Sequence, residues 1–174
     1  MTRRTRLRRT TILCLHFLRN LGFHRAWNAA PQTRRREQFW ISLNANFINM
    51  TVLEWCKLFG DRKAMHHWSK SVADHAAFAN GLRQRTGMTE VKFEAYRLAV
   101  REYRDKFVAH LDELPTMHIP DLEPALDSVR YLYTYLLENE DEGNVFPDAP
   151  RNPNAFYRKY LAEGRKAYGA RSVP

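Results

Sequence analysis

Hydrophobic side chains recur three and four residues apart along most of this chain, which is the spacing of helices that bury one face. Alternating runs of Val, Ile and Thr are missing, so the pattern gives little indication of strands. We therefore expect an all-α fold, a bundle of four to five helices with a basic N-terminal arm and a short C-terminal helix. The helices are predicted over residues 36–59, 64–72, 74–85, 90–114, 126–138 and 154–168.

Glycine, threonine and proline mark the predicted helix ends. Gly60 closes the first helix, because glycine is the usual residue just past a helix end. Gly87 breaks the helix over 74–85, and Thr89 can cap the next one by accepting a backbone N–H. Pro115 ends that helix.

Positive charge is concentrated at the N-terminal end. The 174 residues carry a net charge of +9, and residues 1–36 contain ten arginines, no lysine and no acidic residue. The other residues hold 18 Lys and Arg against 19 Asp and Glu, so they are close to neutral. The sequence therefore divides into a basic arm (1–35), a helical bundle (36–142), and a Pro-rich loop with the C-terminal helix (143–174).

The basic arm has three interpretations. It is a flexible segment that contacts phosphates, a targeting segment, or a poorly ordered extension. On each of them the core begins near Phe39, so we expect the bundle to fold without residues 1–35.

Cys14 and Cys56 stand far apart and in no metal-ligand spacing, which suits a reducing compartment. No apolar run approaches the length of a membrane span. We expect a cytoplasmic protein that does not bind a membrane.

The candidate catalytic residues are Arg104, Asp105 and His110, within a predicted helix. A guanidinium offers planar, permanently charged donors to a phosphate, and an imidazole gives or takes a proton near neutral pH. The pair fits phosphodiester cleavage of RNA without a metal, with Asp105 orienting one of the two. On one helix, Arg104 and His110 are about 240° and about 9 Å apart, so a two-fold dimer could supply one of them from a second copy.

Two other interpretations compete with this one. Arg104 and Asp105 could be a solvated helix face, with His110 packed near the helix end. The Arg-then-His spacing is also common in this chain, since it recurs at Arg9/His16, Arg19/His24 and Arg62/His67.

Four further cations are candidate RNA contacts: Arg101 and Lys106 beside the motif, and Arg158 and Lys159 in the C-terminal helix. For that helix the alternative is simple docking of Phe156, Tyr160 and Leu161 on the bundle. In "DRKAMHHWS", the possible metal ligands are Asp61, His66 and His67. Adjacent histidines point about 100° apart on a helix, so we expect packed or partner-facing histidines, no metal site and no cofactor.

The stretch "YRDKFVAHLDEL" resembles the motif of the HEPN superfamily. The segments "FINMTVLEWCKLFGDRKAMHHWS" and "HIPDLEPALDSVRYLYTYLL" are similar to its abortive-infection, AbiU-like branch, and the resemblance covers about residues 36–140. It implies a helical bundle, a homodimer, and metal-independent RNA cleavage by a toxin or anti-phage effector, with the motif at Arg104, Asp105 and His110. It also implies an antitoxin protein as partner; the Tyr that some members carry two residues after the His is Asp112 here, which disfavours an antitoxin that modifies that Tyr. The alternative is a non-catalytic module of the same fold that binds nucleotides or mediates dimerisation.

Overall fold

The structure, a computed structural model, describes residues 1–109 and 118–169, and these residues form helices and loops without a strand. The prediction of an all-α fold is confirmed. The longer helices are α1 (Arg3–Ala26), α3 (Gln38–Trp55), α4 (His75–Thr86), α5 (Glu90–Tyr103), α6 (Glu123–Asn139) and α7 (Pro153–Gly169). Shorter turns are η1 (Trp27–Ala29), α2 (Gln32–Arg36), η3 (Trp68–Lys70) and the π-helical turns η2 (Cys56–Gly60) and η4 (Arg104–Ala109).

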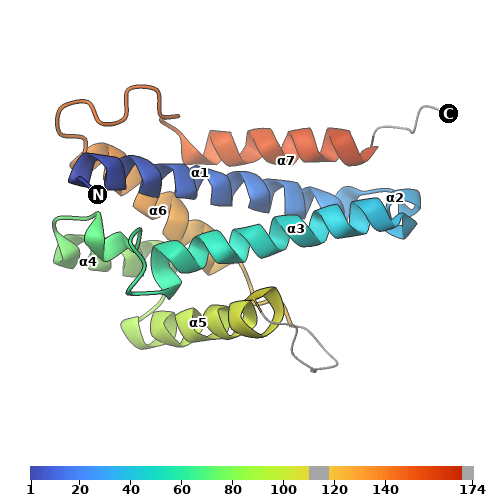
Figure 1. Cartoon of the computed structure of the whole chain (residues 1–174), viewed down its shortest axis with the longest axis horizontal. Helices are drawn as coiled ribbons and strands as arrows, with labels where there is room; N and C mark the ends of the chain where they lie inside the picture. Colours follow the sequence, from blue (N-terminus) through green and yellow to red (C-terminus); the bar gives the residue numbers. More distant parts are fainter. Residues whose placement is uncertain (110–117, 170–174) are drawn as a thin grey trace.

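Helix α1 lies in the middle of the molecule, so the prediction of a disordered basic arm is wrong. Figure 1 shows α1 between α7 and α3, with α6 crossing behind. Its side chains Leu7, Phe17, Leu18 and Leu21 are fully buried in the main core. Seven of the ten arginines that suggested a solvated arm belong to α1 and lie outside its buried stripe, where long side chains keep their charge in water.

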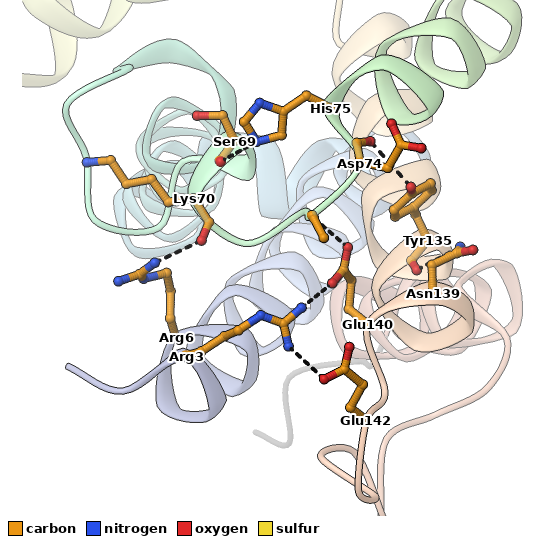
Figure 2. A network of polar contacts seen from close by, with 11 residues as sticks. Arg3, Arg6, Ser69, Lys70, Asp74, His75, Tyr135, Asn139, Glu140 and Glu142 are labelled. Atoms are coloured by element: carbon orange, nitrogen blue, oxygen red, sulfur yellow. Dashed lines mark hydrogen bonds and ion pairs between the residues drawn. The ribbon is translucent and has the colours of Figure 1, made fainter.

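The first turn of α1 is held by charged and polar contacts (Figure 2). Arg3 pairs with the buried carboxylate of Glu140, which follows α6, and that carboxylate also accepts the Ala73 N–H at 2.7 Å. Arg6 donates to the Lys70 carbonyl at 2.9 Å. Since these partners come from separate parts of the chain, the basic N-terminus fastens the end of α6 to the loop before α4.

Several predicted helix ends are confirmed. The helix predicted over 36–59 is α3 continued by η2. Asp74 caps α4 through a 2.9 Å bond from the Ala77 N–H, and Gly87 ends α4 with a φ of 64°, which glycine adopts without strain. Thr89 accepts the Lys92 N–H at 3.3 Å and begins α5, as predicted.

Two predicted helices differ from the structure. Residues 64–72 form a loop with only the short turn η3, because Lys70 and Ser71 amides bond three residues back to His67 and Trp68 carbonyls. The helix predicted over 90–114 is α5 up to Tyr103 and then the wider turn η4; its predicted end at Leu114 and Pro115 lies outside the described residues.

Helix α7 packs along α1 at close range. A Cβ built on Gly164 would stand 2.7 Å from the Ala26 Cβ, and one on Gly22 would stand 3.1 Å from the Leu161 backbone nitrogen. Phe156 and Leu161 pack against the core, so the docking interpretation of this helix is confirmed. None of the helices in the described ranges has both the length and the apolar character needed to cross a membrane.

Candidate functional site

Arg104 and Asp105 form a close ion pair at the end of α5. The Asp105 Oδ1 accepts from Arg104 Nε at 2.7 Å and lies 2.6 Å from Arg104 Nη2. The Arg104 side chain is only 19% exposed, whereas that of Asp105 is 50% exposed. Successive residues of a helix do not normally face each other, and the pair forms here because the long Arg side chain turns back at the start of η4.

The neighbouring cations also have defined surroundings. Arg101 packs against Gly60 of η2, and its buried Nε has no hydrogen-bond partner within residues 1–109 and 118–169. The Lys106 Nζ lies 2.6 Å from Glu102 Oε1. The motif end of α5 therefore holds two half-buried guanidinium groups and one paired ammonium.

Cys56 lies under this cluster in η2. Burial raises the pKa of its thiol to about 11, although the charges of Arg104 and Arg101 act in the opposite direction. The thiol is therefore protonated near neutral pH and is a buried, apolar neighbour of the arginines rather than a nucleophile.

The structure brings together only part of the predicted site. Arg101, Arg104, Asp105 and Lys106 share the end of α5 and η4, whereas His110 lies outside the described residues.

Arg158 and Lys159 belong to α7, which Figure 1 places across α1 and α3 from α5. The Lys159 Nζ stands 5.4 Å from the Tyr160 ring, a cation–π contact at the surface of α7. Within one copy of the chain, the four predicted RNA contacts therefore do not form a single surface.

A cavity of about 630 Å³ lies between α4 and α5, and sequence reasoning did not identify it. Its walls include Phe59, Trp68 and Phe93. Glu94 at its edge is paired with Arg97 at 2.5 Å and with Arg62 at 3.2 Å, and the bonds from Arg97 hold the pKa of Glu94 below its usual range.

His67 lines the same cavity and is buried, as one of the two interpretations of this histidine predicted. Its Nδ1 lies 2.8 Å from Ser69 Oγ, and burial lowers its pKa to about 4. No three His, Cys, Asp or Glu side chains in the part of the chain that the structure describes come together as metal ligands.

A second cavity, of about 400 Å³, is lined by Arg9 and His16 of α1, Lys57 of η2, and His66. Arg9 and His16 are seven residues apart, about two helical turns, and so lie on one face of α1. Their spacing was noted from the sequence, but α1 was not recognised as a helix, so the shared face was missed.

No family model, no curated protein and no solved structure matches this chain. The resemblance to the HEPN superfamily therefore remains a prediction that depends on the motif residues.

Proposed function

We propose that this protein is a metal-independent endoribonuclease, a HEPN-like toxin or anti-phage effector that acts in the cytoplasm as a homodimer. Arg104 would bind the scissile phosphate, Asp105 would orient Arg104, and His110 would transfer protons. The observation that supports this most is the Arg104–Asp105 pair, because a carboxylate that grips Nε and one Nη leaves the other edge of the guanidinium for a ligand.

The chemistry needs only these groups and the RNA itself. The 2′-hydroxyl loses its proton and attacks phosphorus, the bond to the 5′-oxygen breaks, and that oxygen takes up a proton. His110 would carry out one of these proton transfers, and Arg104 would stabilise the negative charge on the phosphoryl oxygens. The first products are a 2′,3′-cyclic phosphate and a free 5′-hydroxyl.

Arg101 and Lys106 support the same assignment as RNA-binding residues. The Arg101 Nε has no protein acceptor among the described residues and is positioned beside Arg104 by its packing on Gly60. Arg158 and Lys159 would need a second copy of the chain, or a long RNA, to act on the same substrate.

The second candidate is a non-catalytic module that uses the same bundle for dimerisation or nucleotide binding, with RNA cleavage absent. The observation that favours it is again the ion pair, since Asp105 already neutralises the Arg104 charge. An antitoxin protein would be a partner under the first proposal only.

The test is incubation of the purified protein with mixed RNA in EDTA, followed by analysis of the product ends. Under the first proposal, cleavage persists in EDTA, fails on DNA, and leaves cyclic phosphate ends. His110→Ala should lower the rate about 100-fold to 10,000-fold, while the exposed His118, as His118→Ala, serves as the matched control. Arg104→Lys should be nearly as damaging, because lysine loses the planar fork. Cleavage that needs a divalent ion, or that is unchanged in His110→Ala, would support the module.

A further inference from the structure

The second cavity, of about 400 Å³, is a mostly apolar pocket with cations and histidines in its lining, and the ribonuclease proposal does not use it. It lies between α1, η2 and the loop that follows η2, and its volume falls in the range of about 300–1,000 Å³ typical of ligand pockets. It is lined by Arg9, Ile12, Leu13, His16, Lys57, Met65 and His66.

Two of its side chains are cations without a carboxylate partner. In the described ranges, neither Arg9 nor Lys57 forms an ion pair, and the Arg9 guanidinium donates to the Met1 sulfur at 3.7 Å. Two other arginines of α1 differ in this respect: Arg3 pairs with Glu140, and Arg25 pairs with Glu123 at 2.9 Å. The cavity therefore carries positive charge that the protein does not neutralise.

His16 lies close to the buried side chain of Glu54. Its Nδ1 lies 3.5 Å from Oε1 of Glu54, and the other oxygen of Glu54 accepts from Asn20 Nδ2 at 3.1 Å. His16 itself lines the cavity, so its ring is available to a ligand there. Glu54 comes from α3, so two helices determine this geometry.

His66 supplies a polar atom that lacks a partner. Its Nε2 is buried and has no hydrogen bond to any residue in 1–109 or 118–169. Buried ring nitrogens are normally hydrogen-bonded, so this nitrogen has an unused capacity to bond a ligand.

Burial and the surrounding cations both favour the neutral form of the two histidines. Burial and the charges of Arg9, Lys57 and Arg6 lower the pKa of His66, and burial, Arg19 and Lys57 lower that of His16. Each neutral ring has one donor and one acceptor nitrogen. Lys57 and both rings line the same cavity.

We propose that this cavity binds a phosphate monoester, with Arg9 and Lys57 on the phosphoryl oxygens, His16 and His66 completing the hydrogen bonds, and the ester group against Ile12 and Met65. A phosphate monoester carries about −1.5 to −2 charges at pH 7, which matches two unpaired cations better than the single charge of a carboxylate does. Its three terminal oxygens also provide more acceptors than a carboxylate, for the cations and the ring donors. Ile12 and Met65 are 48% and 56% exposed, and an apolar ester group would cover them. The site is separate from the α5 motif, so it does not depend on RNA cleavage.

The test is calorimetric titration of the full chain in chloride buffer with phenyl phosphate, inorganic phosphate and benzoate. We expect phenyl phosphate to bind more tightly than either of the other two. Lys57→Gln and Arg9→Gln should each weaken its binding about 10-fold to 100-fold, since each removes one charged hydrogen bond. Lys92→Gln and Arg4→Gln, which make the same charge change at exposed positions away from the cavity, should leave the affinity unchanged.

Two further measurements make the outcome decisive. In nitrogen-detected NMR of the imidazole rings, His16 and His66 should shift with phenyl phosphate, and the exposed His118 should not. Ile12→Ala should weaken phenyl phosphate but not inorganic phosphate. Equal affinity in wild type and Lys57→Gln, or unchanged His16 and His66 signals, would overturn the site. Benzoate binding as tightly as phenyl phosphate would overturn the assignment to a phosphate monoester.

Discussion

Replacement of one buried leucine in α1 tests whether the basic N-terminal segment is part of the core. Leu18 is fully buried, so Leu18→Ala removes apolar surface and leaves a cavity, at a cost of about 2–5 kcal/mol. Domains of this kind are stable by about 5–15 kcal/mol, so the loss is a large share of the total. With a urea dependence of about 2 kcal/mol per molar, the unfolding midpoint should fall by about 1–2.5 M.

The measurement is urea unfolding followed by circular dichroism at the helical band. Ile12→Ala is the matched control, because Ile12 belongs to the same helix and is 48% exposed; its cost should be below about 1 kcal/mol. If Leu18→Ala and Ile12→Ala unfold at the same urea concentration, α1 is not packed in the core and the disordered-arm interpretation is restored.

Three further predictions concern packing, a buried carboxylate and a buried histidine. Gly164→Ala places a methyl 2.7 Å from a side-chain carbon of α1 and should lower the free energy of unfolding, measured in urea, by about 1–3 kcal/mol. Gly169→Ala, which has open space around it, should not lower that free energy. Glu140→Ala removes a buried acceptor and should lower the free energy of unfolding by about 1–3 kcal/mol, while Glu142→Ala, whose side chain is 82% exposed, should change it by less than about 1 kcal/mol in the same assay. Burial lowers the pKa of His67 from 6.5 to about 4, so the unfolded chain binds a proton first as the pH falls. Between pH 6.5 and pH 4 the free energy of unfolding of the wild type should therefore fall by about 3 kcal/mol more than that of His67→Asn. An equal fall in both proteins would contradict the assignment.

The helices with clear local signals were predictable from the sequence. Asp74, Gly87 and Thr89 act within a few residues of themselves, so their side chains and backbone preferences are readable without tertiary information. Helix α1 was not, because its buried stripe includes Thr10 and Cys14, which do not stand out as apolar, among many arginines. The buried face of such a helix can be recognised only once the elements that pack against it are known.

For the candidate sites too, contacts between sequence neighbours were predictable and contacts between distant segments were not. Arg104 and Asp105 are neighbours in sequence, so their pairing was within reach of sequence reasoning. The cavity of the proposed phosphate site is lined by α1, η2 and the loop after η2, and Glu54 of α3 lies next to its His16. No local sequence spacing relates Glu54 to His16 or Lys57 to His66. The only local sign was the seven-residue interval between Arg9 and His16, which has meaning only once those residues are known to be helical.

The position of α1 also changes how the proposed RNA binding must be tested. Deleting residues 1–35 would remove arginines that hold the fold, since Arg8 donates to the Val145 carbonyl at 3.0 Å and Arg25 pairs with Glu123 at 2.9 Å. Such a deletion would lower nucleic-acid binding whether or not those arginines contact phosphates, because it also removes core side chains such as Phe17. Substitution of the exposed Arg4 by Gln removes charge without removing core, so a flatter salt dependence of binding in that variant would identify a phosphate contact.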